Sequence, residues 1–244
     1  MSRHGTLIRA VTWNIHGCVG RRGRFDPDAI AVLLRELNPD ILALQEVDSR
    51  TARSVGLDTF AYLAETLGLF ALHARTIRTP SGDYGHMLMS RWHFFDGDEH
   101  DLSVGNREPR HAITGEIRTF ERPLWILAAH LGLRAAERRI QVDRIRRLAD
   151  HCGNGPAIIL GDFNEWRYPG VAGRSLCPPF HPVERLLSYP SVRPLFPLDR
   201  IWYRGPLSLR RAWIVGAGRL HSDHLPLAAE WQMGAGRQPF EVSA

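Results

Sequence analysis

Lysine is absent from this sequence of 244 residues, so all 31 of its basic residues are arginine, against 26 acidic residues. The formal net charge of +5 permits a polyanionic partner such as nucleic acid or anionic lipid. Complete replacement of lysine by arginine is, however, more typical of a coding bias than of a selected binding face. The charge balance therefore allows nucleic-acid binding without requiring it.

Cysteines and long apolar runs are also scarce. Cys18, Cys152 and Cys177 are scattered without metal-ligand spacing, and their odd number argues against a disulfide framework. No apolar run approaches the roughly 18 residues of a membrane-spanning helix. The first residues lead almost at once into a strand-like segment, which leaves no room for a signal peptide. We therefore expect a chain without a transmembrane segment that works in the cytoplasm.

Hydrophobic periodicity predicts alternating strands and helices in one domain over residues 1–232, followed by a tail at 233–244. Asp26 and Pro27 have the N-cap and first-turn types that begin a helix, and Asn38 ends it. Further helices are predicted at 58–67 and 135–149. The predicted strands cover residues 8–13, 41–44, 70–74, 86–90, 112–119, 124–129, 157–160, 199–203, 211–215 and 226–231.

Residues 165–198 differ from the rest of the chain because they hold seven prolines and little periodicity. We interpret this segment as a long, ordered active-site loop. Its aromatic residues could stack a base, cover a lipid head group or simply anchor the loop: Trp166, Tyr168, Phe180 and Tyr189. Arg167 could reach a phosphate, although exposed arginines are common in this chain.

Polar residues end or adjoin many of the predicted strands. They are Asn14, Glu46, His130, Asp162 with Asn164, Asp199, and Asp223 with His224. Taken singly, each is more often a capping or turn residue than a functional one. Together at strand ends, where α/β folds gather their ligands, they predict a shared site.

The residue types in this set suit hydrolysis of a phosphate ester. Mg²⁺ is often held by one or two carboxylates and substrate phosphate, so Glu46 is the best metal ligand, with Asn14 as a second ligand or its positioner. His224, polarised by Asp199, could be the base that activates water.

The remaining members of the set would serve the reacting phosphate. Asp162 and Asn164 would orient water and stabilise the charged transition state, and His130 would donate to a phosphoryl oxygen. No Cys/His cluster indicates structural zinc.

An ordered series of motifs supports this reading: Trp13-Asn14-Ile15-His16-Gly17, Leu44-Gln45-Glu46-Val47, Ala129-His130-Leu131, Gly161-Asp162-Phe163-Asn164, Leu198-Asp199-Arg200-Ile201 and Ser222-Asp223-His224-Leu225-Pro226. From about Ile8 to Trp231 the chain resembles the endonuclease/exonuclease/phosphatase superfamily. The resemblance implies an α/β four-layer sandwich, in which two packed mixed β-sheets are flanked by helices. It also implies dependence on Mg²⁺ or Mn²⁺.

The resemblance assigns several roles. Asp223 matches a second metal-facing carboxylate, and His130 matches a histidine that contacts phosphate. Arg107-Glu108-Pro109 resembles a segment whose arginine reaches phosphate, with Arg110 as the other candidate for that arginine. His86 stands where relatives carry a substrate-contacting asparagine, which puts local substrate contacts in doubt.

The superfamily contains enzymes for several kinds of phosphate ester, and the fold does not choose among them. His16 replaces an aspartate of the DNA-repair branch, and neither disulfides nor a docking hairpin mark a secreted nuclease or sphingomyelinase. We favour a lipid-derived or small-molecule phosphodiester, with DNA or RNA as the alternative substrate. A non-catalytic phosphate-binding protein is the third reading. The oligomeric state does not follow from the sequence.

Overall fold

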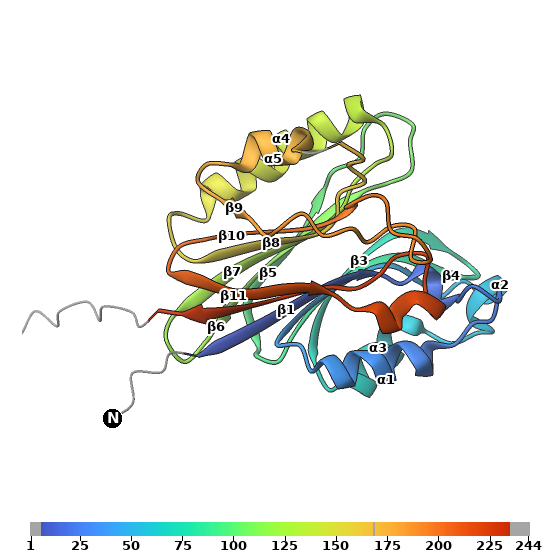
Figure 1. Ribbon diagram of the computed structural model, residues 1–244. Coiled ribbons are helices and arrows are strands. Elements are labelled where there is room, and N and C mark those ends of the chain that lie inside the picture. Colours follow the sequence, from blue (N-terminus) through green and yellow to red (C-terminus); the bar gives the residue numbers. More distant parts are fainter. Residues whose placement is uncertain (1–5, 168, 235–244) are drawn as a thin grey trace, which may run out of the picture.

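Alternating strands and helices build two six-stranded sheets in the computed structural model, which describes residues 6–167 and 169–234 (Figure 1). The first sheet has the order β11-β12-β1-β2-β4-β3, with bounds Leu207–Ile214, Leu227–Met233, Leu7–Asn14, Ile41–Asp48, Gly82–Ser90 and Phe70–Thr79. The second has the order β5-β6-β7-β8-β10-β9, with bounds Phe94–Asp101, His111–Arg118, Pro123–His130, Ala157–Asp162, Asp199–Arg204 and His181–Pro182.

Each sheet is mixed, since it contains one parallel pair among antiparallel ones. β1 and β2 run parallel and are connected through α1 (Pro27–Leu37), whereas β7 and β8 run parallel and are connected through α4 (Ala135–His151). Parallel neighbours need such a crossover, and a helix commonly provides it. The parallel pairs bring the carboxyl ends of β1 and β2, and of β7 and β8, to one edge of each sheet.

Apolar side chains fill three layers of packing. Between the sheets, Ile8 and Leu88 of the first pack with Ile126 and Leu160 of the second. α1 and α3 (Thr59–Leu67) cover the outer face of the first sheet, and α4 with α5 (Gly170–Leu176) covers that of the second (Figure 1). The predicted four-layer α/β sandwich with two mixed sheets is therefore confirmed.

Local signals explain where α1 begins and ends. The Asp26 side chain accepts a hydrogen bond from the Ala29 amide, and Asn38 adopts a left-handed conformation after the last turn. An N-cap carboxylate satisfies one of the amide groups that a helix start leaves unpaired. These are the two boundaries that the sequence predicts.

The segment 165–198 is more structured than the predicted loop. It contains α5 and the short strand β9, and the buried Glu165 carboxylate accepts hydrogen bonds from the Val171 and Ala172 amides at the start of α5. The prediction of an ordered segment without secondary structure was therefore wrong for α5 and β9. Glycines and prolines hide the helix because both residues have low helix propensity.

Besides two short 3-10 helices, His16–Cys18 and Gly216–Leu220, two further elements were not predicted. β5 is a polar edge strand with mostly exposed residues, so it has little of the apolar alternation on which sequence analysis depends. α2 (Thr51–Ser54) is a single turn. None of the helices within residues 6–167 and 169–234 has the length and apolar character needed to span a bilayer. The domain limits remain a prediction, and residues 235–244 of the predicted tail lie outside the described residues.

Candidate active site

Strand register gathers the polar residues predicted from the sequence at one edge of the sandwich. Asn14 pairs with Gln45 as the last pair between β1 and β2, and His130 pairs with Asp162 at the ends of β7 and β8. Asp199 opens β10 opposite Asp162, because β10 runs antiparallel to β8. β1 packs over β8 and β10, so these strand ends from the two sheets meet.

Asn14 connects the two sheets within this cluster. Its Nδ2 donates to Glu46 Oε1 at 2.9 Å and to Asp162 Oδ2 at 3.1 Å, while its Oδ1 accepts from the His16 amide at 3.1 Å. The sequence left open whether Asn14 is a ligand or a positioner. In this arrangement its amide group holds two carboxylates from different sheets in fixed positions.

Several residues at these joined strand ends, called the cleft below, have unusual backbone conformations. Glu46 has a φ of 56° and lies where the register between β2 and β4 shifts, at a β-bulge between Leu44 and Val47. Such a bulge turns a side chain away from ordinary strand alternation. His16 and Asn164 also have positive φ values, of 49° and 50°. Non-glycine residues in this region carry strain, which tends to concentrate at functional sites.

Glu46, Asp223 and His16 form the more open side of the cleft. His16 Nδ1 lies 3.9 Å from Glu46 Oε2 and 3.5 Å from Asp223 Oδ1, and all three side chains are partly exposed. In the described part of the chain, no group of three or more His, Cys, Asp or Glu residues forms a ready-made metal cage. Two carboxylates open to water nevertheless fit a hard divalent cation that keeps several water ligands and binds substrate phosphate.

His224, Asp199 and Asp162 form the buried side of the cleft. His224 Nδ1 lies 2.8 Å from Asp199 Oδ2, and its Nε2 lies 3.8 Å from Asp162 Oδ2. Burial lowers the pKa of His224, but the negative charges of Asp199 and Asp162 outweigh it and raise the pKa to about 10. Burial together with the charge of Asp199 raises the pKa of Asp162 to about 6, despite the opposing charge of His224. His224 is therefore a cation at neutral pH.

His130 faces Asp162 from β7. Its Nε2 lies 3.5 Å from Asp162 Oδ2, and its Nδ1 lies 3.1 Å from Arg110 Nη1. A guanidinium group only donates, so Nδ1 must accept and the ring proton belongs on Nε2. Burial and the positive charge of Arg110 hold the pKa of His130 well below its usual range. His130 is thus a neutral donor that points its N–H into the cleft.

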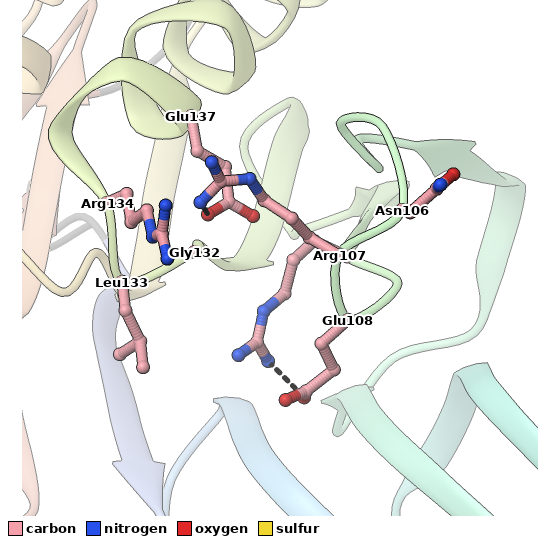
Figure 2. Close-up of a pocket in the computed structure, with 8 residues that line it drawn as sticks. Asn106, Arg107, Glu108, Gly132, Leu133, Arg134 and Glu137 are labelled. Atoms are coloured by element: carbon pink, nitrogen blue, oxygen red, sulfur yellow. Dashed lines mark hydrogen bonds and ion pairs between the residues drawn. The ribbon is translucent and has the colours of Figure 1, made fainter.

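Of the two candidate arginines, Arg110 contacts the cluster through His130, whereas Arg107 lines a pocket beside it (Figure 2).

His86 is buried on β4, in a crevice also lined by Arg110 and His130. Burial lowers the pKa of His86 to about 3, so it is neutral. Its side chain is only 2% exposed, so His86 lies beneath the cleft surface.

The Asp162–Asn164 turn is held by its own hydrogen bonds. The Asn164 amide donates to Asp162 Oδ1 at 2.9 Å, and its side-chain Nδ2 donates to the Leu131 carbonyl at 2.8 Å. These bonds tie the ends of β7 and β8 together and fix the direction of the Asp162 carboxylate.

Aromatic residues of the segment 165–198 lie beside the buried cluster. The Trp166 ring is 4.5 Å from Phe196 and 6.0 Å from Tyr189, whose ring is in turn 4.8 Å from His224. Trp166 is nonetheless 43% exposed, so it both anchors the segment and offers a free face. Arg167 is exposed, and it makes no hydrogen bond or ion pair within the described residues. Tyr168 lies outside the described residues.

Two residues of the cleft had no role in the sequence analysis. Ser222 Oγ donates to the Asn14 carbonyl at 2.6 Å and accepts from the His224 amide at 3.1 Å, which joins the last motif to the first. Tyr84 lies near Glu46, and burial together with that carboxylate raises the pKa of its hydroxyl. Ser222 could have been found from the sequence because it begins the Ser-Asp-His motif. No sequence feature marked Tyr84 as a residue of the site.

A two-sheet α/β sandwich whose joined strand ends present carboxylates and imidazoles defines a class of phosphoester hydrolases. The sequence profile of the Endonuclease/Exonuclease/phosphatase family matches residues 11–224, and the chain belongs to this family. It is a hydrolase of phosphate esters, and enzymes of this family generally use divalent metals.

Similar proteins cover nearly the whole chain. The uncharacterized protein YbhP of Escherichia coli (strain K12) is 27% identical over 241 residues, which is 91% of this chain and 95% of YbhP. An endonuclease/exonuclease/phosphatase from Beutenbergia cavernae has a TM-score of 0.76 at 20% identity, covering 93% of this chain and 72% of its own. The human nocturnin catalytic domain has a TM-score of 0.69 at 19% identity, covering 92% and 94%. These structures share the fold.

Proposed function

We propose that this chain is a divalent-metal-dependent phosphodiesterase in which Glu46 and Asp223 hold Mg²⁺ or Mn²⁺. The observation that carries the proposal is the Asn14 amide, which connects Glu46 on the open side of the cleft to Asp162 on the buried side. Carboxylates for a cation and groups for proton transfer therefore share one cleft. The bound cation would neutralise charge on the phosphate and polarise a phosphoryl oxygen.

The protonation states of His224 and Asp162 support one distribution of the proton transfers. The sequence analysis made His224 the base, but a histidine with a pKa of about 10 already holds its proton at neutral pH. Asp162, with a pKa raised to about 6, is the better acceptor for the proton of the attacking water. The His224 cation, held by Asp199, then stabilises the negative charge that gathers on the phosphoryl oxygens.

His130 supplies a neutral hydrogen bond to the same phosphate. Arg110 fixes its tautomer, so His130 Nε2–H is available for a phosphoryl oxygen without a change of protonation. Asn164 orients Asp162 through its backbone amide. Each of these groups is in place before substrate arrives, which lowers the cost of reorganisation in the transition state.

A small or lipid-derived phosphodiester is the substrate class that we favour. The space beside the cleft is a pocket of about 420 Å³, a size that suits a small group. The exposed face of Trp166 offers an apolar contact for the remainder of such a molecule. Cytoplasmic action remains a prediction from the sequence.

DNA or RNA is the alternative substrate, and one observation favours it. A second depression of about 240 Å³ is lined by Arg21, Arg22 and Arg24 together with His221, two residues before Asp223. Arginines on this further surface would suit a longer polyanion. D. rerio TDP2, a structural neighbour, has been solved with a single-strand DNA product. The third reading, a phosphate-binding protein without activity, is disfavoured by the intact His224–Asp199 pair.

A substrate panel tests the proposal. We expect hydrolysis of bis-p-nitrophenyl phosphate, or of phosphodiesters in lipid vesicles, at a higher kcat/KM than hydrolysis of p-nitrophenyl phosphate, plasmid DNA or single-stranded RNA. A clear preference for DNA or RNA would replace the favoured substrate by the alternative. Absence of turnover on every member with Mg²⁺ or Mn²⁺ would contradict the enzymatic proposal.

A further inference from the structure

Beside the catalytic cluster lies a pocket whose charged groups, Arg110 apart, have no role in the steps above. It has a volume of about 420 Å³ and includes three arginines, Arg107, Arg110 and Arg134, with Glu108 and Glu137 among its walls (Figure 2). The arginines come from the segment before β6 and from the start of α4. The segment before β6 and the start of α4 therefore both contribute positive charge to this one pocket.

Ion pairs account for two of these three arginines. Arg110 Nη1 lies 3.0 Å from Glu108 Oε1, and Arg107 Nη1 lies 3.4 Å from the buried carboxylate of Glu137. The absence of a side chain at Gly132 makes room for Glu137, because a Cβ there would meet its carboxylate at about 2 Å. These two ion pairs balance their own charges, so the net positive charge of the pocket comes from another residue.

Arg134 supplies that excess charge. Its side chain is exposed, and among residues 6–167 and 169–234 no hydrogen bond or ion pair engages its guanidinium group. Figure 2 shows Arg134 and Arg107 entering from different segments of the backbone, with the Arg107 guanidinium at the Glu137 carboxylate. The Arg107–Glu137 distance is long for a strong hydrogen bond, so Arg107 can also turn a donor toward a ligand.

The pocket adjoins the proposed reaction centre directly. Arg110 lines the pocket and contacts His130 Nδ1 at 3.1 Å, and Gly132 follows β7 two residues after His130. Arg110 thus connects the pocket to the histidine whose Nε2 is proposed to face the scissile phosphate.

We propose that this pocket binds a second phosphate group of the substrate, with Arg134 and Arg107 as its two ligands. This inference rests on the proposed phosphodiesterase function and narrows its substrate to esters that carry another phosphate on one side of the scissile bond. Two guanidinium groups that line one pocket from different segments of the chain present paired N–H donors, which match phosphate oxygens. The net charge of the pocket favours an anion over a neutral group.

Binding of a matched pair of nucleotides tests the pocket without turnover. Metal-loaded protein is titrated calorimetrically with thymidine 3′,5′-bisphosphate and with thymidine 5′-phosphate, which differ by one phosphate. We expect the wild type to bind the bisphosphate about tenfold more tightly, as a pair of charge-assisted contacts implies. Arg134→Gln should remove this preference, and Arg139→Gln, at an exposed arginine of α4 that does not line the pocket, should retain it.

Equal affinity for the two nucleotides in the wild type, or a preference that persists in Arg134→Gln, would overturn the proposal. The turnover comparison uses the p-nitrophenyl ester of thymidine 5′-phosphate with and without a 3′-phosphate. We expect Arg134→Gln to lower kcat/KM about tenfold for the 3′-phosphorylated ester only. If the wild type hydrolyses neither ester, the proposed function fails, while the calorimetric preference still decides whether the pocket binds phosphate.

Discussion

Replacing Asp199 by asparagine should change the charge of His224 while leaving the shape of the cleft intact. Asp199 Oδ2 lies 2.8 Å from His224 Nδ1, both residues are buried, and Asp199 Oδ1 has no hydrogen-bond partner in the described structure. The negative charge of Asp199 is therefore compensated chiefly by His224. An adjacent opposite charge shifts a pKa by about 1 to 3 pH units, so the pKa of His224 should fall by that amount.

Nuclear magnetic resonance of the metal-free protein measures this pKa. The imidazole resonances of the 12 histidines are followed against pH, and the His224 signal is identified by its loss in His224→Gln. In the wild type we expect His224 to keep its proton up to about pH 10. In Asp199→Asn it should titrate between about pH 7 and 9, because the charges of Asp162, at 3.8 Å, and of Asp223 still oppose desolvation.

The dependence of folding stability on pH tests the raised pKa of His224 independently. A histidine whose pKa rises on folding stabilises the native state fully below its unfolded pKa of about 6.5, and this contribution is lost as the pH rises toward 10. Asp199→Asn should therefore be most destabilised relative to the wild type at acidic to neutral pH. The reasoning is refuted if wild-type His224 titrates near pH 6.5, or if Asp199→Asn leaves its titration unchanged.

Three further predictions concern the other groups of the cleft. Glu46→Gln should weaken Mn²⁺ binding by more than about 100-fold in calorimetry, since loss of outer-shell partners alone costs 10- to 100-fold. The circular dichroism spectrum should be unchanged. Near-normal affinity for Mn²⁺ would show that Glu46 is not a metal ligand. Arg110→Gln should allow His130 to carry its proton on either ring nitrogen, which ¹⁵N spectra would show, and should lower kcat about tenfold or more. If His130 keeps the Nε2–H tautomer in this variant, Arg110 does not fix the tautomer. Trp166→Ala should raise KM for esters with an apolar group and leave kcat within about twofold, because its exposed face contacts no catalytic atom. A comparable loss in kcat would show that Trp166 contributes to the chemical step.

Much of the fold followed from apolar periodicity and helix boundary residues. The Asp26–Pro27 start and Asn38 end of α1 are local signals, and the buried strands β1, β2, β7 and β8 carry continuous apolar runs. β5 escaped prediction because an exposed edge strand needs no apolar face. α5 escaped because its stability depends on the buried Glu165 carboxylate at its start, which is a tertiary contact.

The site residues could be proposed because most of them end strands that the sequence itself predicts. The contacts of these residues across the two sheets could not be predicted, because Asn14 contacts Asp162 only when β1 packs over β8. The contact of Arg110 with His130 at 3.1 Å, which separates it from Arg107, could not be predicted either. The proposed exchange of roles between His224 and Asp162 needed their shared burial, since pKa values depend on surroundings that no motif records.

The central claim is that one cleft combines a divalent cation on Glu46 with proton transfer through Asp162 and His224. Hydrolysis of bis-p-nitrophenyl phosphate by the pure protein, with Mn²⁺ and with excess EDTA, tests it most directly when Glu46→Gln and His224→Gln are assayed alongside the wild type. The account predicts turnover by the wild type that EDTA abolishes, and a loss of about 100-fold or more in both variants. Turnover that survives EDTA, or that either variant retains at the wild-type rate, would contradict it.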